Sequence, residues 1–180
     1  MQASSATTTR IRYVLDFWFG KPSDADYLKS KPFWYGDDAA DNHVRQHLSD
    51  DYEKAKCGQY NDWLDSADGA LALVILLDQV PRNIFRNTAQ AYATDDKALE
   101  IAKRIVASGW DEHQPDIVRR YMYSPFNHSE NLEDQRRSVE LFTKLGDREH
   151  LHWAKNFYDT IKTYGRFPHR DGILGRRPSS

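Results

Sequence analysis

Several features that mark other classes of protein are scarce in this sequence of 180 residues. It contains one cysteine, Cys57, so no internal disulfide can form and a disulfide-stapled secreted module is excluded. The longest apolar run, residues 70–77, is far shorter than the roughly 20 residues of a membrane-spanning helix. Residues 1–9 lack the apolar block of a signal peptide. We therefore expect a cytoplasmic protein that does not insert into membranes.

No charge of one sign dominates, because 25 Lys and Arg residues face 27 Asp and Glu residues for a net charge of −2. General nucleic-acid binders carry a basic excess, so nucleic acid is not an expected partner. Aromatic residues, by contrast, are abundant: 5 Trp, 10 Tyr and 8 Phe exclude a disordered chain. The length fits one domain, which we place at residues 10–176 between polar, flexible tails at 1–9 and 177–180.

Apolar residues recur at helical spacing along nearly the whole chain, and no convincing alternating strand interrupts them. The pattern predicts an all-α fold, an antiparallel bundle or helical-hairpin array of about seven helices. Pro81 is expected to end or kink the third helix, and a later helix is expected to stop before Pro125. His128 would then stand at the start of the helix that follows.

Polar residues on apolar helix faces are the informative ones, because a buried polar group needs a partner or a function. Asp78 continues the apolar face of the third predicted helix, and Arg82 and Arg86 follow at intervals of four. The two guanidiniums can clamp an anionic substrate through forked hydrogen bonds, with Asp78 as a catalytic carboxylate. The alternative is a buried Asp78–Arg82 ion pair that locks the turn after the helix.

A second polar cluster surrounds His128, which shares a helical stripe with Gln135. At a helix start the positive end of the dipole disfavours the imidazolium, so a neutral His128 would suit a general base. Glu130 is a second candidate catalytic group, or it simply matches the helix dipole, and Gln135 is a candidate substrate ligand. The alternative for His128 is a satisfied core histidine.

The third cluster lies in the glycine- and proline-punctuated loop near the C-terminus. Arg166 and Arg170 can bind carboxylate or phosphate, and His169 can move protons. The alternative is a segment that seals the bundle, with arginine stems packed on aromatic rings. A metal site built from His128, His169 and Asp171 is a minor alternative, and we predict neither a metal nor a cofactor.

Three segments in this order carry a family resemblance: Leu-Ala-Leu-Val-Ile-Leu-Leu-Asp-Gln-Val-Pro-Arg-Asn, ending at Asn83, then His128-Ser-Glu, then Gly165-Arg-Phe-Pro-His-Arg. On these motifs, most of the chain resembles the uncharacterised domain-of-unknown-function family nine hundred and twenty-four. The resemblance implies an all-α fold similar to tetratricopeptide repeats and brings no settled activity. Asp171 and Arg177 depart from the family's pattern, which has asparagine and an acidic residue there. Positions that match its signature are Asp78, Gln79, Arg82, Asn83, Arg86, Asp95, His128, Glu130, Gln135, Arg166, His169 and Arg170.

Two functions fit these residues. In the favoured one, an inter-helix pocket binds a small anionic metabolite and supports metal-independent acid–base catalysis, as a hydrolase, lyase or isomerase. Whether the protein is an enzyme stays open, as does its oligomeric state. This function requires His128, Arg82 and His169 to converge on a solvent-reachable cavity. The candidate catalytic residues are Asp78, His128, Glu130 and His169, and the candidate substrate-binding residues are Arg82, Arg86, Gln135, Arg166 and Arg170.

The alternative function is a tetratricopeptide-like scaffold that binds a peptide or protein partner. The polar motifs would then be structural ion pairs, and the binding surface would be an exposed concave face that carries aromatic side chains. Candidates for that face are Phe33, Trp34, Tyr35, Trp63 and Trp110.

Overall fold

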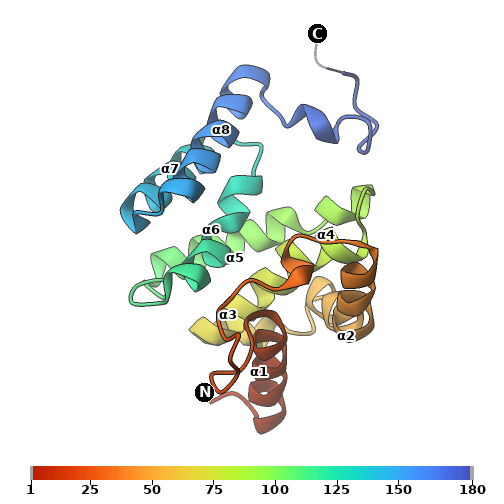
Figure 1. The fold of residues 1–180 in the computed structure, drawn as a ribbon, viewed down its shortest axis with the longest axis vertical. Helices are drawn as coiled ribbons and strands as arrows, with labels where there is room; N and C mark the ends of the chain where they lie inside the picture. Colours follow the sequence, from red (N-terminus) through yellow and green to blue (C-terminus); the bar gives the residue numbers. More distant parts are fainter. Residues whose placement is uncertain (1, 179–180) are drawn as a thin grey trace.

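The computed structural model describes residues 2–178, and in that range it is a stack of helices without strands (Figure 1). A π-helical turn, Ile75–Gln79, joins α3 to α4, so that the two form one continuous helical segment. If that segment is counted once, the described chain has seven helices, and the all-α prediction is confirmed. The helices are α1 (Ser5–Phe19), α2 (Asp38–Lys56), α3 (Ala67–Val74), α4 (Val80–Ile84), α5 (Asp95–Ala107), α6 (Asp116–His128), α7 (Leu132–Leu145) and α8 (Arg148–Tyr164).

Helices pack mainly on near neighbours in the chain. The contacts run from α1 to α3, from α2 to α4 and from α3 to α5, and then in sequence from α5 through α6 and α7 to α8. Figure 1 shows the α7–α8 pair at one end and α1 and α2 at the other, with α5 and α6 between them. The segment after α8, which contains the short 3-10 helix Pro168–Arg170, turns away from the α7–α8 pair toward the side where α4 lies (Figure 1).

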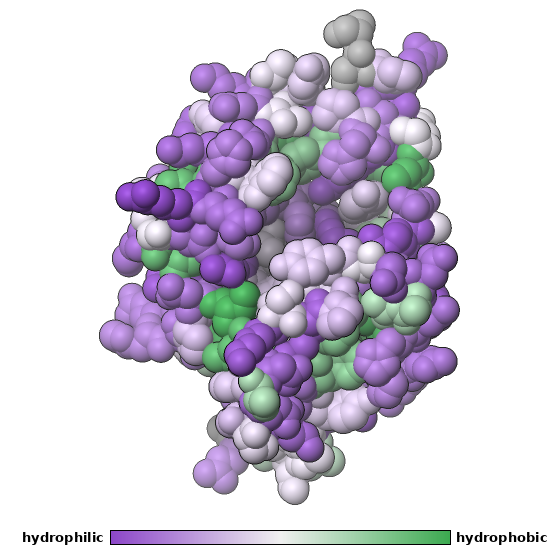
Figure 2. All heavy atoms as spheres, in the orientation of Figure 1, coloured by the Kyte–Doolittle hydropathy of each residue, from purple (hydrophilic) through white to green (hydrophobic). Residues whose placement is uncertain are grey.

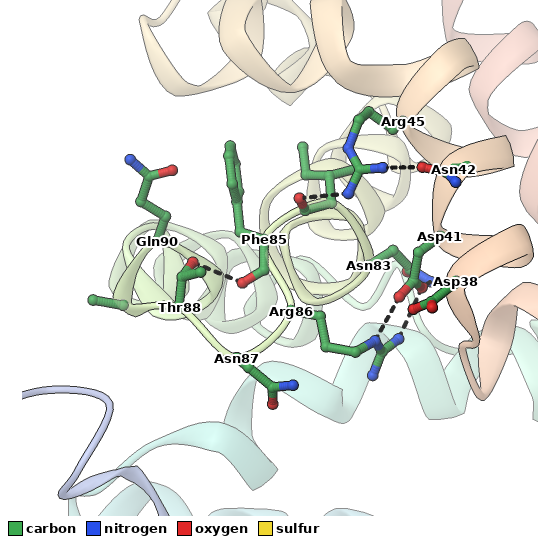
Figure 3. Close-up of a pocket in the computed structure, with 12 residues that line it drawn as sticks. Asp38, Asp41, Asn42, Arg45, Asn83, Phe85, Arg86, Asn87, Thr88 and Gln90 are labelled. Atoms are coloured by element: carbon green, nitrogen blue, oxygen red, sulfur yellow. Dashed lines mark hydrogen bonds and ion pairs between the residues drawn. The ribbon is translucent and has the colours of Figure 1, made fainter.

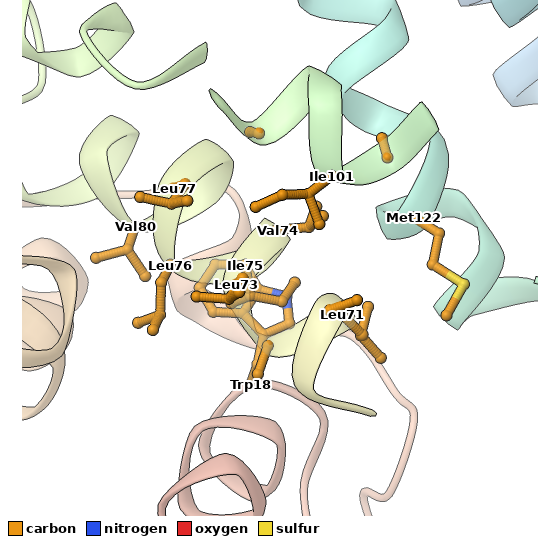
Figure 4. Close-up of a cluster of buried hydrophobic side chains, with 14 of the residues drawn as sticks. Trp18, Leu71, Leu73, Val74, Ile75, Leu76, Leu77, Val80, Ile101 and Met122 are labelled. Carbon is orange, nitrogen blue, oxygen red and sulfur yellow. The ribbon is translucent and has the colours of Figure 1, made fainter. Parts of the chain in front are cut away.

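The centre of the core is the apolar segment at residues 70–77. These residues are buried on all sides, which explains why the sequence shows no polar face there. Figure 4 shows Trp18 of α1, Ile101 of α5 and Met122 of α6 around this segment. Asp78 follows directly after the segment, so the chain carries a carboxylate into the hydrophobic core.

The N-terminal helix begins earlier than the sequence suggested. The Ser4 hydroxyl accepts a hydrogen bond from the Thr7 backbone N–H, a typical N-cap, and α1 starts at Ser5 rather than near residue 10. Parts of the predicted tails, namely residues 1, 179 and 180, lie outside the described residues. None of the helices within residues 2–178 has the length and apolar character to cross a bilayer.

Two prolines that were expected to end or kink helices lie inside helical segments. A proline leaves the carbonyl four residues earlier without its helical donor. For Pro81 that carbonyl is Leu77 O, at the π turn, and it accepts a hydrogen bond of 2.6 Å from the Thr94 hydroxyl. For Pro125 it is Tyr121 O, and the Ser124 hydroxyl lies 3.0 Å away. The Thr94 hydroxyl therefore takes the place of the donor lost at Pro81. At Pro125 the single proton of the Ser124 hydroxyl can serve either Tyr121 O or Asp78 Oδ2, which lies 2.9 Å from it. The helix continues at both prolines.

The position predicted for His128 was therefore wrong. Because α6 runs through Pro125, His128 is the last residue of α6 and not the first residue of the next helix. The helix that follows, α7, begins only at Leu132, where the Asn131 side chain accepts from the N–H groups of Glu133 and Asp134. At a C-terminal end the helix dipole favours a cationic side chain, the opposite of the predicted effect.

Candidate functional site

Asp78 is the centre of the buried polar network at the end of the central helical segment. Its side chain is 0% exposed. Its Oδ1 lies 2.7 Å from His128 Nδ1, and its Oδ2 accepts from Gln79 Nε2 at 2.7 Å and from Ser124 Oγ at 2.9 Å. The guanidinium of Arg82 is 3.7 Å from Oδ1. Both carboxylate oxygens therefore accept hydrogen bonds, from Gln79 in the π-helical turn and from Ser124 and His128 in α6.

The ionised form of Asp78 is the stable one in this network. Burial alone would raise the pKa of Asp78, but the charges of His128 and Arg82 outweigh it and, with the hydrogen bonds from His128 and Gln79, lower that pKa. The ionised carboxylate can only accept, so His128 Nδ1 must carry the proton between them. In the neutral ring Nε2 is then the free acceptor, and it has no hydrogen-bond partner within residues 2–178.

Two arginines share the carboxylate of Asp95 at the start of α5. Arg82 binds it with both amino groups, at 2.8 and 2.9 Å, and donates to the Asp78 backbone carbonyl at 2.6 Å. The main ion pair of Arg82 is therefore with Asp95, and the predicted Asp78–Arg82 contact is the longer one. Arg170 lies 3.9 Å from the same carboxylate and donates to the backbone carbonyl of His128 at 3.1 Å.

The three sequence motifs meet at one cavity of about 320 Å³, which opens to solvent between α4, α6, α8 and the 3-10 helix Pro168–Arg170. Five of its lining residues were candidates from sequence: Arg82, Arg86, His128, His169 and Arg170. Tyr92, Phe157 and Phe167 form its aromatic walls. Figure 2 shows this hydrophilic face of the molecule hollowed near its centre, between the α7–α8 end and the lower helices.

His169 is an exposed residue at the rim of this cavity. Partial burial and the neighbouring charge of Arg170 lower the pKa of His169, although Glu130 opposes the effect. Since an unperturbed histidine titrates near pH 6.5, a lowered pKa leaves His169 neutral at neutral pH. It is therefore an uncharged imidazole beside the cationic Arg170.

Arg86 lies between this cavity and a larger one. Its guanidinium pairs with Asp41 of α2 through Nε to Oδ2 at 2.6 Å and NH2 to Oδ1 at 2.9 Å (Figure 3). Asn83 also donates to Asp41, at 2.9 Å. The larger cavity, about 790 Å³, lies on the α2 side of Arg86 and contains none of the histidines. Arg86 is thus held from one side by Asp41 and borders the His128 cavity from the other.

Glu130 lies outside the His128 cavity. It accepts from the Phe167 backbone N–H at 2.6 Å and from two amino groups of Arg176 at 2.8 and 3.2 Å. Burial would raise the pKa of Glu130, but the hydrogen bonds from Arg176 and Phe167 outweigh it and lower that pKa. Glu130 thus fastens the C-terminal loop to the end of α6, and it also borders a smaller cavity of about 170 Å³ on the other side of His128.

Gln135 and Arg166 also lie outside the His128 cavity. Gln135 is buried in α7, and its amide donates to the carbonyls of Asn127 and Ser129 at 2.9 and 2.7 Å, which satisfies the end of α6. Arg166 pairs with Asp171 at 3.1 Å. Asp171 is therefore engaged within the C-terminal loop.

The alternative metal site is also not formed by the side chains that the structure describes. Within residues 2–178, no three or more His, Cys, Asp or Glu side chains gather in a group that could hold a metal ion.

Sequence reasoning gave no role to three residues that shape the site. Asp95 belonged to a recognised motif, but its pairing with Arg82 across 13 positions was not predicted. Ser124 and Tyr92 were not singled out at all. The serine directly before Pro125 was the available signal, because a carbonyl freed by a proline needs a donor.

Comparison with known proteins gives the family and no activity. The family model described as "Bacterial protein of unknown function (DUF924)" matches residues 14–180. A solved structure of a protein of unknown function from Agrobacterium tumefaciens, ATU0120, is 36% identical and superimposes with a TM-score of 0.85. That similarity covers 96% of this chain and 94% of the other. The search of curated proteins gives no match. The motifs and the family match together lead to one conclusion: the chain belongs to the DUF924 family.

Proposed function

We propose that the cavity beside His128 binds a small anionic metabolite and that His128 is its acid–base catalyst. The observation that carries the proposal is the 2.7 Å contact between His128 Nδ1 and the buried carboxylate of Asp78. A carboxylate in this position holds the imidazole in one tautomer and stabilises the imidazolium that forms when Nε2 takes a proton. The ring edge that is free of protein partners is then the one that a ligand can reach.

The proposed chemistry is a proton transfer at Nε2. His128 takes a proton from the bound ligand, or from a water next to it, and returns the proton to the product or leaving group. Asp78 stays ionised throughout. Hydrolysis, elimination and isomerisation all use such a step, and none of these proton transfers needs a cofactor. His169, as a neutral imidazole at the rim, is the candidate for a second proton carrier.

The charges around the cavity support an anionic ligand. Arg82, Arg86 and Arg170 contribute three guanidiniums to its lining. The carboxylates that neutralise them lie behind the wall: Asp41 behind Arg86, and Asp95 between Arg82 and Arg170. A ligand that enters the cavity therefore meets the cationic groups first, and a negative charge on it is favoured.

Two variants of His128 separate catalysis from structure. In His128→Asn the amide nitrogen stands near the place of Nδ1 and can still donate to Asp78, but nothing replaces Nε2. In His128→Gln the amide nitrogen stands near the place of Nε2, and the donor to Asp78 is lost. We expect His128→Asn to unfold close to wild type, and His128→Gln to lose about 1–3 kcal/mol because a buried acceptor loses its donor.

The assay is a thermal-shift screen of small organic acids, followed by a turnover measurement on each acid that stabilises the protein. Both variants should lose turnover completely, while His128→Asn keeps its stability. The proposal is wrong if no acid stabilises wild type, or if His128→Asn turns over every ligand at the wild-type rate.

The scaffold alternative has less support. Of its five candidate aromatic residues, Phe33 and Trp63 are buried in the core, and Trp34 and Trp110 pack partly against it. Tyr35 alone among the five is exposed, at 78%. These side chains therefore do not supply a continuous aromatic face for a peptide.

A further inference from the structure

Arg170 differs from the other arginines at the cavity in how deeply it is held. Its residue is 6% exposed, although a guanidinium normally stays in water. The central carbon of its guanidinium lies 4.4 Å from the centre of the Tyr92 ring and 4.7 Å from that of the Phe167 ring. Both rings belong to the cavity wall, so aromatic contacts fix Arg170 in place at the edge of the ligand space.

Arg170 leaves more of its five N–H donors unused than either neighbouring arginine does. Arg82 uses both amino groups on Asp95 and on the backbone. Arg86 uses Nε and NH2 on Asp41. Arg170 makes one hydrogen bond, from NH2, while its Nε is buried without a partner and its NH1 is 3.9 Å from Asp95, beyond hydrogen-bond range. A buried charge with unused donors is unfavourable unless an acceptor forms hydrogen bonds with those donors.

The surroundings of Arg170 restrict the shape of that acceptor. The donors of a guanidinium all lie in its plane, and a carboxylate in the same plane accepts two of them side by side. A phosphate or sulfate is tetrahedral, so some of its oxygens must leave that plane. Next to Arg170 they would meet the flat faces of the Tyr92 and Phe167 rings, which offer oxygen atoms no donor, and such unpaired polar atoms are costly.

We infer that the ligand of this site is a small carboxylic acid, held edge-on by Arg170 beside His128. This inference rests on the proposed function and narrows its anion to one chemical class. The cavity of about 320 Å³ is at the lower end for ligand sites, which limits the ligand to a small metabolite. Phe157 and Phe167 give the carbon body of the acid an apolar wall, while Arg170 holds its carboxylate.

The test compares planar and tetrahedral anions on the full chain. Acetate, benzoate and succinate are titrated against inorganic phosphate and sulfate at one pH and one ionic strength, with binding measured by calorimetry and thermal shift. We expect at least one carboxylate to bind wild type about tenfold or more tightly than either tetrahedral anion, because only the planar anion forms the forked pair without turning further oxygens toward the aromatic rings. Arg170→Lys keeps the charge but not the fork, and should abolish this preference. Arg137→Lys, at an exposed arginine paired with Glu140, is the matched control and should behave as wild type.

Each outcome has a distinct meaning. Phosphate or sulfate that binds wild type as tightly as every carboxylate overturns the inference and leaves the proposed anion site standing. Binding of none of the five anions overturns both. If Arg170→Lys unfolds, the ratio measured on wild type still decides the matter.

Discussion

Asp78→Asn is the substitution that most sharply probes the buried network. The amide has nearly the shape of the carboxylate, so the packing of the surrounding core stays as it is. What changes is the charge and one acceptor: the side chain becomes neutral, and one of its two oxygens becomes an NH2 group. In the wild type those two oxygens accept from three groups, His128, Gln79 and Ser124.

The expected loss of stability follows from these three contacts. Hydrogen bonds to a charged group contribute roughly 1.5–3 kcal/mol each and neutral ones roughly 0.5–1.5, a difference of about 1 kcal/mol per bond. Three bonds give about 3 kcal/mol, at the lower end of the roughly 3–5 kcal/mol for removing one partner of a buried ion pair. For a chain of this size that is a fall of about 6–12 °C in Tm.

The assay is urea unfolding of wild type, Asp78→Asn and the control Asp68→Asn. Asp68 also pairs with an arginine, Arg12, at 2.9 Å, but its side chain is 57% exposed. The control should therefore lose less than about 1 kcal/mol. The amide of Asp78→Asn should also donate to His128 and reverse its tautomer, so any turnover should fall steeply while the fold persists. If Asp78→Asn unfolds within 1 kcal/mol of the control, the described network does not stabilise the protein and the reasoning fails.

Three further predictions concern backbone and charge. Gly36→Ala should destabilise by about 2–3 kcal/mol in thermal melts, because φ is +76° and the new Cβ would lie 1.7 Å from Arg86 NH2. Gly146→Ala, at φ +80° with open space around it, should cost only about 1–2 kcal/mol; equal costs would contradict the contact with Arg86. Thr94→Val removes the hydroxyl that satisfies the carbonyl freed in the π turn, and should cost about 1–3 kcal/mol in urea unfolding; a neutral result would contradict that role. Folding lowers the pKa of Asp78, so its stabilising contribution is complete above about pH 4 and disappears as the pH falls through the lowered value. Unfolding curves from pH 7 to pH 2 should show this loss, and Asp78→Asn should show less of it.

Helical periodicity was enough to predict the fold class, because a buried helix face repeats locally along the chain. It failed at Pro81 and Pro125, where local rules demand a break. A hydroxyl lies beside each freed carbonyl, and for Pro81 that hydroxyl, on Thr94, is 17 residues from the carbonyl it satisfies. Because α6 continues past Pro125, His128 lies at the C-terminal end of α6 and not, as predicted, at the start of the next helix.

At the candidate site, too, the sequence predicted the residues better than it predicted their partners. Residue type and spacing identified Asp78, Arg82, His128, His169 and Arg170, since each is a polar group on an otherwise apolar face or in a structured loop. Spacing alone favoured an Asp78–Arg82 pair at one helical turn, but folding brings Asp95 closer to Arg82 and gives Asp78 to His128. Such choices between partners depend on distances that only the packed helices fix.

The tautomer of His128 is the measurement that tests the central claim most directly. Long-range proton–nitrogen NMR correlations on histidine-labelled protein, at a pH where the ring is neutral, distinguish a proton on Nδ1 from one on Nε2. The structure predicts Nδ1 protonated toward Asp78 and an Nε2 signal that moves when a stabilising acid is added. A ring protonated on Nε2, or an Nε2 signal that no such acid shifts, would contradict the account.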